Sequence, residues 1–309
     1  MLKALSMTDY RALAVATDFW RPGESYIDKV TDALEKKVAD DDFVIVSEKA
    51  LSTSMGRIID EGNINPGLNA RIISQFWMRI IWGYFLGVLC HFGQRLLQRL
   101  RQYPPAPGSR HKQVALEYAG LLQSLLFGSE GGIDGSNLPY SYVSLPLVNA
   151  CEIAQNIRHQ ILKALGKHVC VIIVDTDKTY SFRNFHFTSR PKPLRGIHSS
   201  AGVVGYIVGR SFEFRRRSTP LAVAGCKLQA EEALRLANTA DRVRGPGSGA
   251  TVWDMAARFN VPVTAVTWEM LSEISHKPIV ILRQKPTKRH SSGSARVKNK
   301  PCIALKEEL

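Results

Sequence analysis

Three short and almost entirely apolar segments, far apart in the chain, constrain the fold most strongly. They are 43–46 (FVIV), 168–174 (HVCVIIV) and 278–283 (PIVILR). Short apolar runs between polar turns are typical of strands buried on both faces of a sheet. Between them, helical spacing of apolar residues recurs in 25–38 and 149–165. Strands that alternate with helices predict an α/β chain with a mixed, partly α+β organisation.

Residues 72–90 form the most apolar stretch of the sequence (IISQFWMRIIWGYFLGVLC). Its length approaches that of a membrane span. Arg79 lies near its middle, where a charge would cost about 2.5–3.5 kcal/mol on insertion scales. The sequence therefore favours an amphipathic helix that docks on a surface or forms a dimer over one that crosses a membrane.

Two other segments also have expected structures. The glycine-rich, apolar residues 196–209 are typical of strands with close backbone approach. Residues 215–217, three consecutive arginines, are typical of a solvated loop.

The charge of the chain is strongly positive but uneven. The 309 residues include 41 Lys and Arg against 27 Asp and Glu, a net charge of +14. Six of the basic residues lie in 284–300, which has no acidic residue. The remaining excess is typical of proteins that handle phosphorylated or polyanionic ligands, and it does not by itself indicate nucleic acid.

The five cysteines are scattered, and no two form a CxxC pair. This pattern argues against a disulfide framework or a zinc site and is typical of a reducing compartment. The first 20 residues have no continuous apolar core of the signal-peptide type. The expected location is therefore the cytoplasm.

Asp134 and Asp175 are the most informative pair of polar residues. Asp175 follows the apolar run 168–174, and Asp134 lies in the glycine-rich stretch 131–137. α/β proteins place ligand groups at the carboxyl ends of buried strands. Mg²⁺ is usually held by one or two carboxylates together with phosphate oxygens and water, and Thr176 adds a hydroxyl. The alternative is that both aspartates only stabilise turns.

A second candidate site is the glycine-rich loop 245–249 (GPGSG), which precedes an expected helix at 251–259. Backbone N–H groups at a helix start can bind phosphate, and Arg242 and Arg244 would add positive charge. Taken alone, the loop is more typical of a flexible turn, because it matches no P-loop or dinucleotide motif. Lys49, after the first apolar strand, could equally contact a phosphate or be an ordinary exposed lysine.

Several segments together resemble the coenzyme F420:L-glutamate ligase family, the GTP-dependent γ-glutamyl ligases of deazaflavin cofactor maturation. The most specific are GGIDGSN at 131–137 and VIIVDTDKTYSFR at 171–183. Weaker likenesses occur at 44–58, 230–249 and 278–283. The resemblance implies a two-part α/β fold peculiar to this family, an intertwined homodimer, a divalent metal (Mg²⁺ or Mn²⁺) and GTP, with ATP as the alternative. Residues 1–283 would form this ligase-like unit, with an apolar helical insertion at about 67–110 and a basic, disordered tail at 284–309.

The family's site residues fall on specific positions of this sequence. The metal ligands fall on Asp134, Asp175 and Thr176. The family contacts its nucleotide after the first apolar strand, and these positions are Glu48, Lys49 and Thr53. It also does so through the asparagine of the loop 131–137, which is Asn137. The expected nucleotide contacts of the late glycine-rich loop are Arg242, Gly245, Gly247 and Gly249. Lys49 and Arg183 are the candidate catalytic clamps for a phosphate or carboxylate.

This sequence departs from the family pattern at two of these places. The family's late loop carries an acidic metal ligand, but residues 242–245 are Arg-Val-Arg-Gly and the nearest acid is Asp241. The Asp-Thr pair is followed here by 177–179 (Asp-Lys-Thr) instead of Gly-Arg. Both departures affect the expected nucleotide site, so the acceptor substrate need not be the deazaflavin coenzyme.

Two functions follow as hypotheses. The favoured one is a metal- and nucleotide-dependent amide ligase, which would add L-glutamate to a phosphorylated deazaflavin-type carboxylate through an acyl phosphate. The alternative is a non-catalytic nucleotide-binding paralogue, whose insertion at 67–110 and tail would bind a partner, a membrane surface or RNA. The sequence does not identify the acceptor, the number of residues added, or GTP as opposed to ATP.

Overall fold

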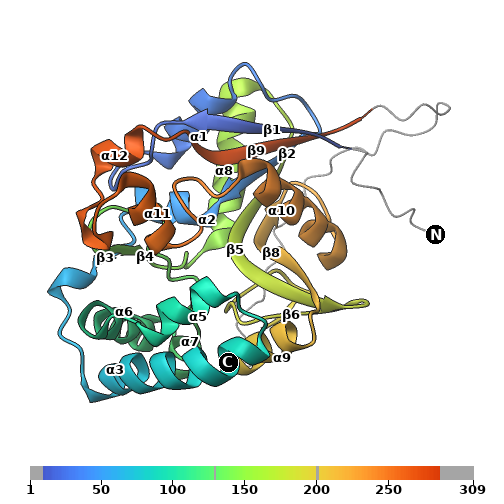
Figure 1. Ribbon diagram of the computed structural model, residues 1–309. Coiled ribbons are helices and arrows are strands. Elements are labelled where there is room, and N and C mark those ends of the chain that lie inside the picture. The colour runs from blue at the N-terminus through green and yellow to red at the C-terminus, as the bar shows by residue number, and fades with distance from the viewer. Residues whose placement is uncertain (1–9, 129, 200–201, 286–309) are drawn as a thin grey trace.

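A computed structural model describes residues 10–128, 130–199 and 202–285 (Figure 1). Its centre is a seven-stranded mixed sheet in the order β1-β9-β2-β5-β6-β7, with β8 also paired to β5. The strands of this sheet are β1 (Tyr10–Thr17), β2 (Phe43–Ser47), β5 (Cys170–Phe182), β6 (Phe185–Thr188), β7 (His198–Ser199), β8 (Arg215–Ala224) and β9 (His276–Gln284). The three apolar runs of the sequence are the adjacent central strands β9, β2 and β5, and the α/β prediction is confirmed.

Side-chain alternation along the central strands divides the core into two layers. Val44 and Val46 face one cluster of buried residues, whereas Ile45 between them faces the other. Helices α1 (Tyr26–Leu34) and α8 (Ala150–Leu165) cover the first face. Helix α10 (Ala230–Arg244) covers the second, so the sheet lies between helices (Figure 1). β2 and β5 run parallel, and β2 ends at Ser47 beside Val174, within the longer β5.

Local signals explain two of these helices. The Ser25 hydroxyl accepts a hydrogen bond from the N–H of Asp28, 3.3 Å away, and caps α1. Helix α8 ends at Gly166, whose φ of 66° is left-handed, as expected for a glycine C-cap. Asn149 precedes α8 but makes no side-chain cap.

The segment between β3 and β4 forms a second, helical layer at one end of the molecule (Figure 1). A continuous helix comprises α3 (Leu68–Ile72), the π-helix η3 (Ile73–Leu86) and α4 (Gly87–Leu89). It packs against α5 (Gln94–Arg101), with Trp82 and Leu100 completely buried. Helices α6 (Pro105–Tyr118) and α7 (Leu121–Ser124) follow. Among the described residues, 68–89 is one helix long and apolar enough, by length and composition, to cross a membrane.

The remaining elements are short and close the region around the carboxyl end of β2. They are β3 (Ile58–Asp60), η2 (Glu61–Asn63), α2 (Glu48–Ser54), β4 (Tyr142–Ser144), α11 (Val252–Phe259), η4 (Val263–Ala265) and α12 (Trp268–Ser272). β3 and β4 pair as a separate two-stranded sheet.

Three sequence predictions are wrong. Residues 196–209 do not form a strand pair: after the two-residue β7 they enter helix α9 (Val203–Ser211). Gly209 explains the difference, because a Cβ there would lie 2.2 Å from the Tyr180 ring of β5, so the glycine lets α9 pack directly on the sheet. Residues 215–217 begin strand β8, and Arg217 is buried and bonded to Glu231.

The third concerns the cysteines. Cys170 of β5 and Cys226, which follows β8, are joined by a disulfide. Their strands are neighbours in the sheet, which brings together two residues that are 56 apart in the sequence. Sequence spacing could not indicate this pairing, because it depends on strand order. The expected tail at 284–309 lies almost entirely outside the described residues.

Candidate functional site

A cavity of about 610 Å³ lies where β2 ends beside the middle of the longer β5, next to the loops 130–138 and 245–250. Its volume is in the range typical of small-molecule sites. Most of the predicted site residues line it. They are Lys49, Thr53, Asp134, Asn137, Asp175, Thr176, Arg242, Gly245, Gly247 and Gly249.

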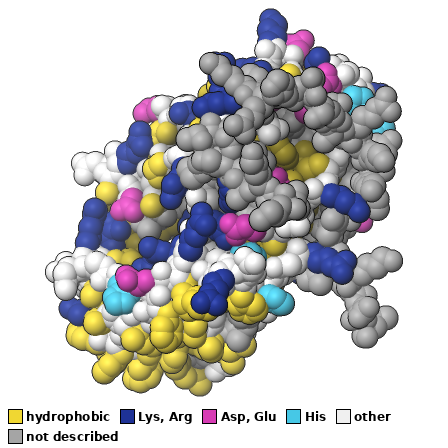
Figure 2. All heavy atoms as spheres, turned by 90° about the vertical axis from the view of Figure 1, so that its right-hand side faces the viewer, with side chains coloured by type: hydrophobic (Ala, Val, Ile, Leu, Met, Phe, Trp, Pro, Cys, Tyr) yellow, Lys and Arg dark blue, Asp and Glu magenta, His cyan; other side chains and the backbone are white. Residues whose placement is uncertain are grey.

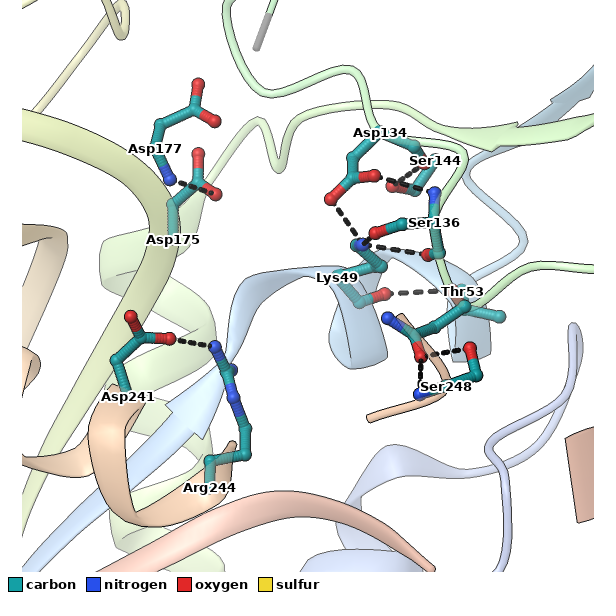
Figure 3. Close-up of polar contacts among 11 residues, drawn as sticks. Lys49, Thr53, Asp134, Ser136, Ser144, Asp175, Asp177, Asp241, Arg244 and Ser248 are labelled. Carbon is teal, nitrogen blue, oxygen red and sulfur yellow. Dashed lines mark hydrogen bonds and ion pairs between the residues drawn. The ribbon is translucent and has the colours of Figure 1, made fainter. Parts of the chain in front are cut away.

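Helix α2 projects Lys49 toward the loop that carries Asp134 (Figure 3). The Lys49 ammonium donates to the backbone carbonyl and to the hydroxyl of Ser136, each at 2.8 Å. It also forms an ion pair with the Asp134 carboxylate. The other Asp134 oxygen accepts from the Ser136 N–H at 2.7 Å, which fixes the carboxylate. Three oxygen atoms from this loop therefore surround one cationic group.

Asp175 is held from behind by Arg190, which is 3% exposed. The Nε of Arg190 donates to Asp175 at 2.7 Å, and a terminal nitrogen donates to Glu48 at 2.6 Å. Glu48 also accepts from the Leu147 N–H at 2.8 Å. One guanidinium thus joins the middle of β5 to the start of α2, and it gives two buried acidic side chains a common partner.

Glu48 lies beneath the cavity and does not line it. Burial raises the pKa of Glu48 to about 8, and the nearby Asp175 adds to this rise while Arg190 opposes it. In this structure Glu48 is bonded to Arg190 and to the Leu147 N–H, and a nucleotide contact at Glu48 stays a prediction.

Close packing against Arg190 also explains one glycine of the GGIDGSN segment. Gly132 has a φ of +99°, and a Cβ there would lie 2.6 Å from the Arg190 Nε. The backbone of the loop can pass over the guanidinium only because this position has no side chain. Arg190 consequently supports the Asp134 loop as well as Asp175.

The glycine-rich loop 245–249 is fixed by Asn137 rather than flexible. The Asn137 side-chain oxygen accepts from the N–H of Ser248 at 2.6 Å and also from its hydroxyl. Gly247 has a φ of +63°, and a Cβ on it would lie 2.6 Å from that oxygen. The loop and the Asp134 segment are therefore joined across the mouth of the site.

Asp241 lies near the end of α10, which leads into this loop. It accepts from Lys178 at 3.1 Å and from the Ser218 hydroxyl at 2.6 Å. It also accepts from Arg244 at 2.6 Å (Figure 3). Burial alone would raise the pKa of Asp241, but Lys178 and Arg244 lower it overall. Asp241 is thus ionised, and it lines the same cavity as Asp134 and Asp175.

An aromatic wall closes another side of the cavity. Phe19, Trp20, Trp268 and His276 all line it. The rings of Phe19 and His276 stack with centroids 4.3 Å apart. Burial lowers the pKa of His276 to about 4, so its ring is neutral near pH 7. This wall has a flat apolar surface suited to an aromatic ring.

Arg183 does not join the site. It lies in the turn between β5 and β6, has a φ of +52°, and places its guanidinium 5.6 Å from the Phe182 ring centroid. Arg183 is predicted to clamp a phosphate or carboxylate of a ligand, whereas Arg190 binds two acidic side chains of the protein, Asp175 and Glu48. No sequence spacing indicated Arg190, because its partners come from a different strand and helix.

The oxygen donors fit a hard divalent cation. Three loop oxygens already hold the Lys49 ammonium, and Asp175 and Thr176 line the same cavity. In the part of the chain that the structure describes, no group of three or more His, Cys, Asp or Glu could hold a metal. Two carboxylates are nevertheless sufficient for Mg²⁺ when phosphate oxygens and water complete the shell.

Comparisons with known proteins identify the family of this chain. Residues 14–224 match the family described as F420-0:Gamma-glutamyl ligase. The chain is 34% identical over 287 residues to the uncharacterized protein MJ1361 of Methanocaldococcus jannaschii, covering 89% of this chain and 97% of that protein. It is 28% identical over 141 residues to the coenzyme F420:L-glutamate ligase of Archaeoglobus fulgidus, covering 45% of this chain and 49% of that enzyme. The match to the family covers most of the central sheet and both aspartate segments, and the chain therefore belongs to the F420-0:gamma-glutamyl ligase family of enzymes.

Proposed function

We propose that this protein is a nucleotide- and metal-dependent ligase that joins the amine of L-glutamate to a carboxylate of a phosphorylated, deazaflavin-type cofactor precursor. GTP is the favoured co-substrate, with ATP as the alternative. The observation that carries the proposal is one cavity lined by three aspartates, several basic residues and a glycine-rich loop. The family assignment supplies the ligase class.

The groups that line the cavity suit the parts of a nucleoside triphosphate. Arg242, Arg244 and Lys49 provide positive charge for the phosphates. The 245–249 loop offers backbone N–H groups, although the N–H of Ser248 is already bonded to Asn137. The aromatic wall of Phe19 and His276 offers a stacking surface for the base.

Asp134, Asp175 and Thr176 would hold a divalent cation, Mg²⁺ or Mn²⁺. Such an ion would supply positive charge that offsets the negative charge developing during phosphoryl transfer. Arg190 orients Asp175, while the Ser136 N–H orients Asp134. Lys49 now neutralises Asp134, so this ammonium and the cation would share the same oxygens.

The reaction has two steps. A carboxylate oxygen of the acceptor attacks the γ-phosphorus, the bond to the β-phosphate oxygen breaks, and the nucleoside diphosphate leaves with that electron pair. The glutamate nitrogen then attacks the acyl carbon, phosphate leaves, and the nitrogen loses a proton. The sum is acceptor, glutamate and nucleoside triphosphate giving amide, nucleoside diphosphate and phosphate. The basic residues around the cavity would hold the anionic reactants in contact.

Calorimetric titration would test nucleotide binding. GTP and ATP would each be titrated into the protein with Mn²⁺ and without it. The wild type should bind one nucleotide in a metal-dependent way, and Asp134→Asn should lose that dependence. Arg183→Ala is the matched control, because this arginine lies in the β5–β6 turn and does not line the cavity. Absence of binding by either nucleotide would refute the proposed site.

A second experiment would test the reaction itself. The protein would be incubated with L-glutamate, the bound nucleotide, Mn²⁺ and the F420-0 precursor, and mass spectrometry would look for the mass of one or more added glutamates. Nucleotide binding without nucleoside diphosphate release would favour the non-catalytic alternative. Nucleotide hydrolysis that depends on a different carboxylate acceptor would keep the ligase class and change the substrate.

A further inference from the structure

The helix formed by 68–89 exposes a row of large apolar side chains on one face. They recur about every four residues: Ile72, Phe76, Ile80, Tyr84 and Val88. Phe85 is 63% exposed and Phe76 is 54% exposed. We call this row, with Phe85, the apolar face. Figure 2 shows hydrophobic side chains gathered at the corresponding end of the molecule. Contiguous exposed apolar surface of this kind marks an interaction site.

The opposite side of the same helix is fixed to the protein. Met78 and Trp82 are completely buried in the helical layer. The indole N–H groups of Trp77 and Trp82 both donate to the Leu125 carbonyl, at 2.9 Å and 2.8 Å. Crossing a membrane would require the loss of this packing and these bonds. The helix can therefore present its apolar face to a surface but remains part of the folded protein.

Helix α9 continues the apolar face. Arg210 of α9 donates to the Cys90 carbonyl at 3.2 Å, which holds α9 beside the end of the long helix. Val204, Val208 and Phe212 are exposed on α9, and Phe212 is 70% exposed. Two separate parts of the chain thus expose apolar side chains in neighbouring helices.

The positive charge of residues 67–110 favours an anionic partner. Residues 67–110 contain six arginines and no aspartate or glutamate. Arg101 lies with its guanidinium 4.5 Å from the Tyr84 ring centroid, at the edge of the apolar face, and Arg71 is exposed beside Ile72. Arg95 and Arg99 face Asp254 of the adjacent helix instead. Apolar side chains bordered by arginine, with aromatic residues among them, are typical of helices that lie in the headgroup region of anionic membranes.

We propose that the apolar face docks on the surface of an anionic lipid bilayer, with the helix in the plane of the interface. Phe76 and Phe85 would enter the acyl boundary, and Arg71 and Arg101 would contact lipid phosphates. The docking places the ligase at a membrane, and it does not depend on the proposed ligase reaction.

Vesicle co-sedimentation of the full chain tests this proposal. The wild type should bind vesicles containing phosphatidylglycerol at low salt, and should bind pure phosphatidylcholine vesicles more weakly. The double variant Phe76→Ser/Phe85→Ser should bind about a hundredfold more weakly, since each buried phenyl contributes at least a factor of ten. Arg71→Gln should weaken binding at low salt only.

The matched control is Leu13→Ser/Val148→Ser, which removes two side chains of similar exposure elsewhere, 47% and 59%. It should bind like the wild type. Because 284–309 is also basic, vesicle binding alone is insufficient, and dependence on Phe76 and Phe85 is the required result. Equal binding by the wild type and the phenylalanine variant, in the folded state by circular dichroism, would overturn the proposal. So would conversion of a dimer to a monomer in that variant without vesicle binding, which would assign the face to a second copy of the chain.

Discussion

Replacing Arg190 with Met should destabilise the protein strongly and in a pH-dependent way. Arg190 is buried and joins Asp175 and Glu48 by hydrogen bonds of 2.7 Å and 2.6 Å. Its removal leaves two buried carboxylates without their common cation. Breaking a buried ion pair by removing one partner costs about 3–5 kcal/mol. At about 2 °C per kcal/mol for a chain of this size, the melting temperature should fall by roughly 6–10 °C.

The pH dependence follows from Glu48. Burial raises its pKa in the folded protein from the ordinary value of 4.5 to about 8. Because the folded pKa is the higher one, the contribution of this group to stability is fully present below pH 4.5 and is lost as pH rises through 8. Arg190 lowers the pKa of Glu48, so this pKa should be higher in the Arg190→Met variant. The free energy of unfolding of the variant should therefore continue to fall at higher pH than that of the wild type. The part of the destabilisation that comes from Glu48 should be small below pH 8, where this group is protonated in both folded proteins, and should grow above pH 8.

Urea denaturation, followed by tryptophan fluorescence at several pH values, measures both effects. Arg215→Met is the control, since its side chain is 62% exposed and lies 3.7 Å from Glu231. It should change the free energy of unfolding by less than about 1 kcal/mol. The reasoning would be refuted if Arg190→Met lowered the free energy of unfolding as little as this control does. It would also be refuted if that decrease did not become smaller toward low pH.

Three further predictions concern other groups. Although burial opposes it, the carboxylates of Glu61 and Glu130 raise the pKa of His111 to about 10. The stability it supplies should be complete below pH 6.5 and lost as pH rises to about 10, a decline that His111→Gln should remove in denaturation measured across that range. Gly247→Ala, with its strained φ and its contact to Asn137, should weaken nucleotide binding in calorimetry, whereas Gly23→Ala, which also has a positive φ but has open space around it, should not. Reducing the Cys170–Cys226 disulfide should cost about 4 kcal/mol for a 56-residue separation, and unchanged thermal unfolding after reduction would contradict this.

The central sheet could be predicted because its signal is local. The runs 43–46 and 171–174 are uninterrupted apolar segments, and burial on both faces requires that composition. Helix α9 could not be predicted in this way. Its valines and isoleucine favour a strand locally, but the close packing of Gly209 on Tyr180 and the burial of Val203 in the helical layer stabilise a helix.

The site was predictable where its residues come from contiguous loops. Asp134, Asn137 and the 245–249 loop fall around one cavity as expected. Arg190 was missed because the β5–β6 hairpin reverses the chain. Arg183 lies at the turn, whereas β6 runs antiparallel to β5 and returns the following residues toward Asp175, pairing Thr188 with Thr179. The direction of the chain, which only the fold reveals, decides which arginine reaches the carboxylate.

The position of α9 has a consequence for any mutational study of this protein. Tyr206 and Arg210 line the cavity, while Val204, Val208 and Phe212 of the same helix are exposed. Gly209 seats the helix against Tyr180, in the strand that carries Asp175. A bulky substitution at Gly209 would therefore displace the inner wall and the outer surface at once. Loss of turnover and loss of surface association would then occur together in such a variant, and neither defect could be assigned to one process from that variant alone.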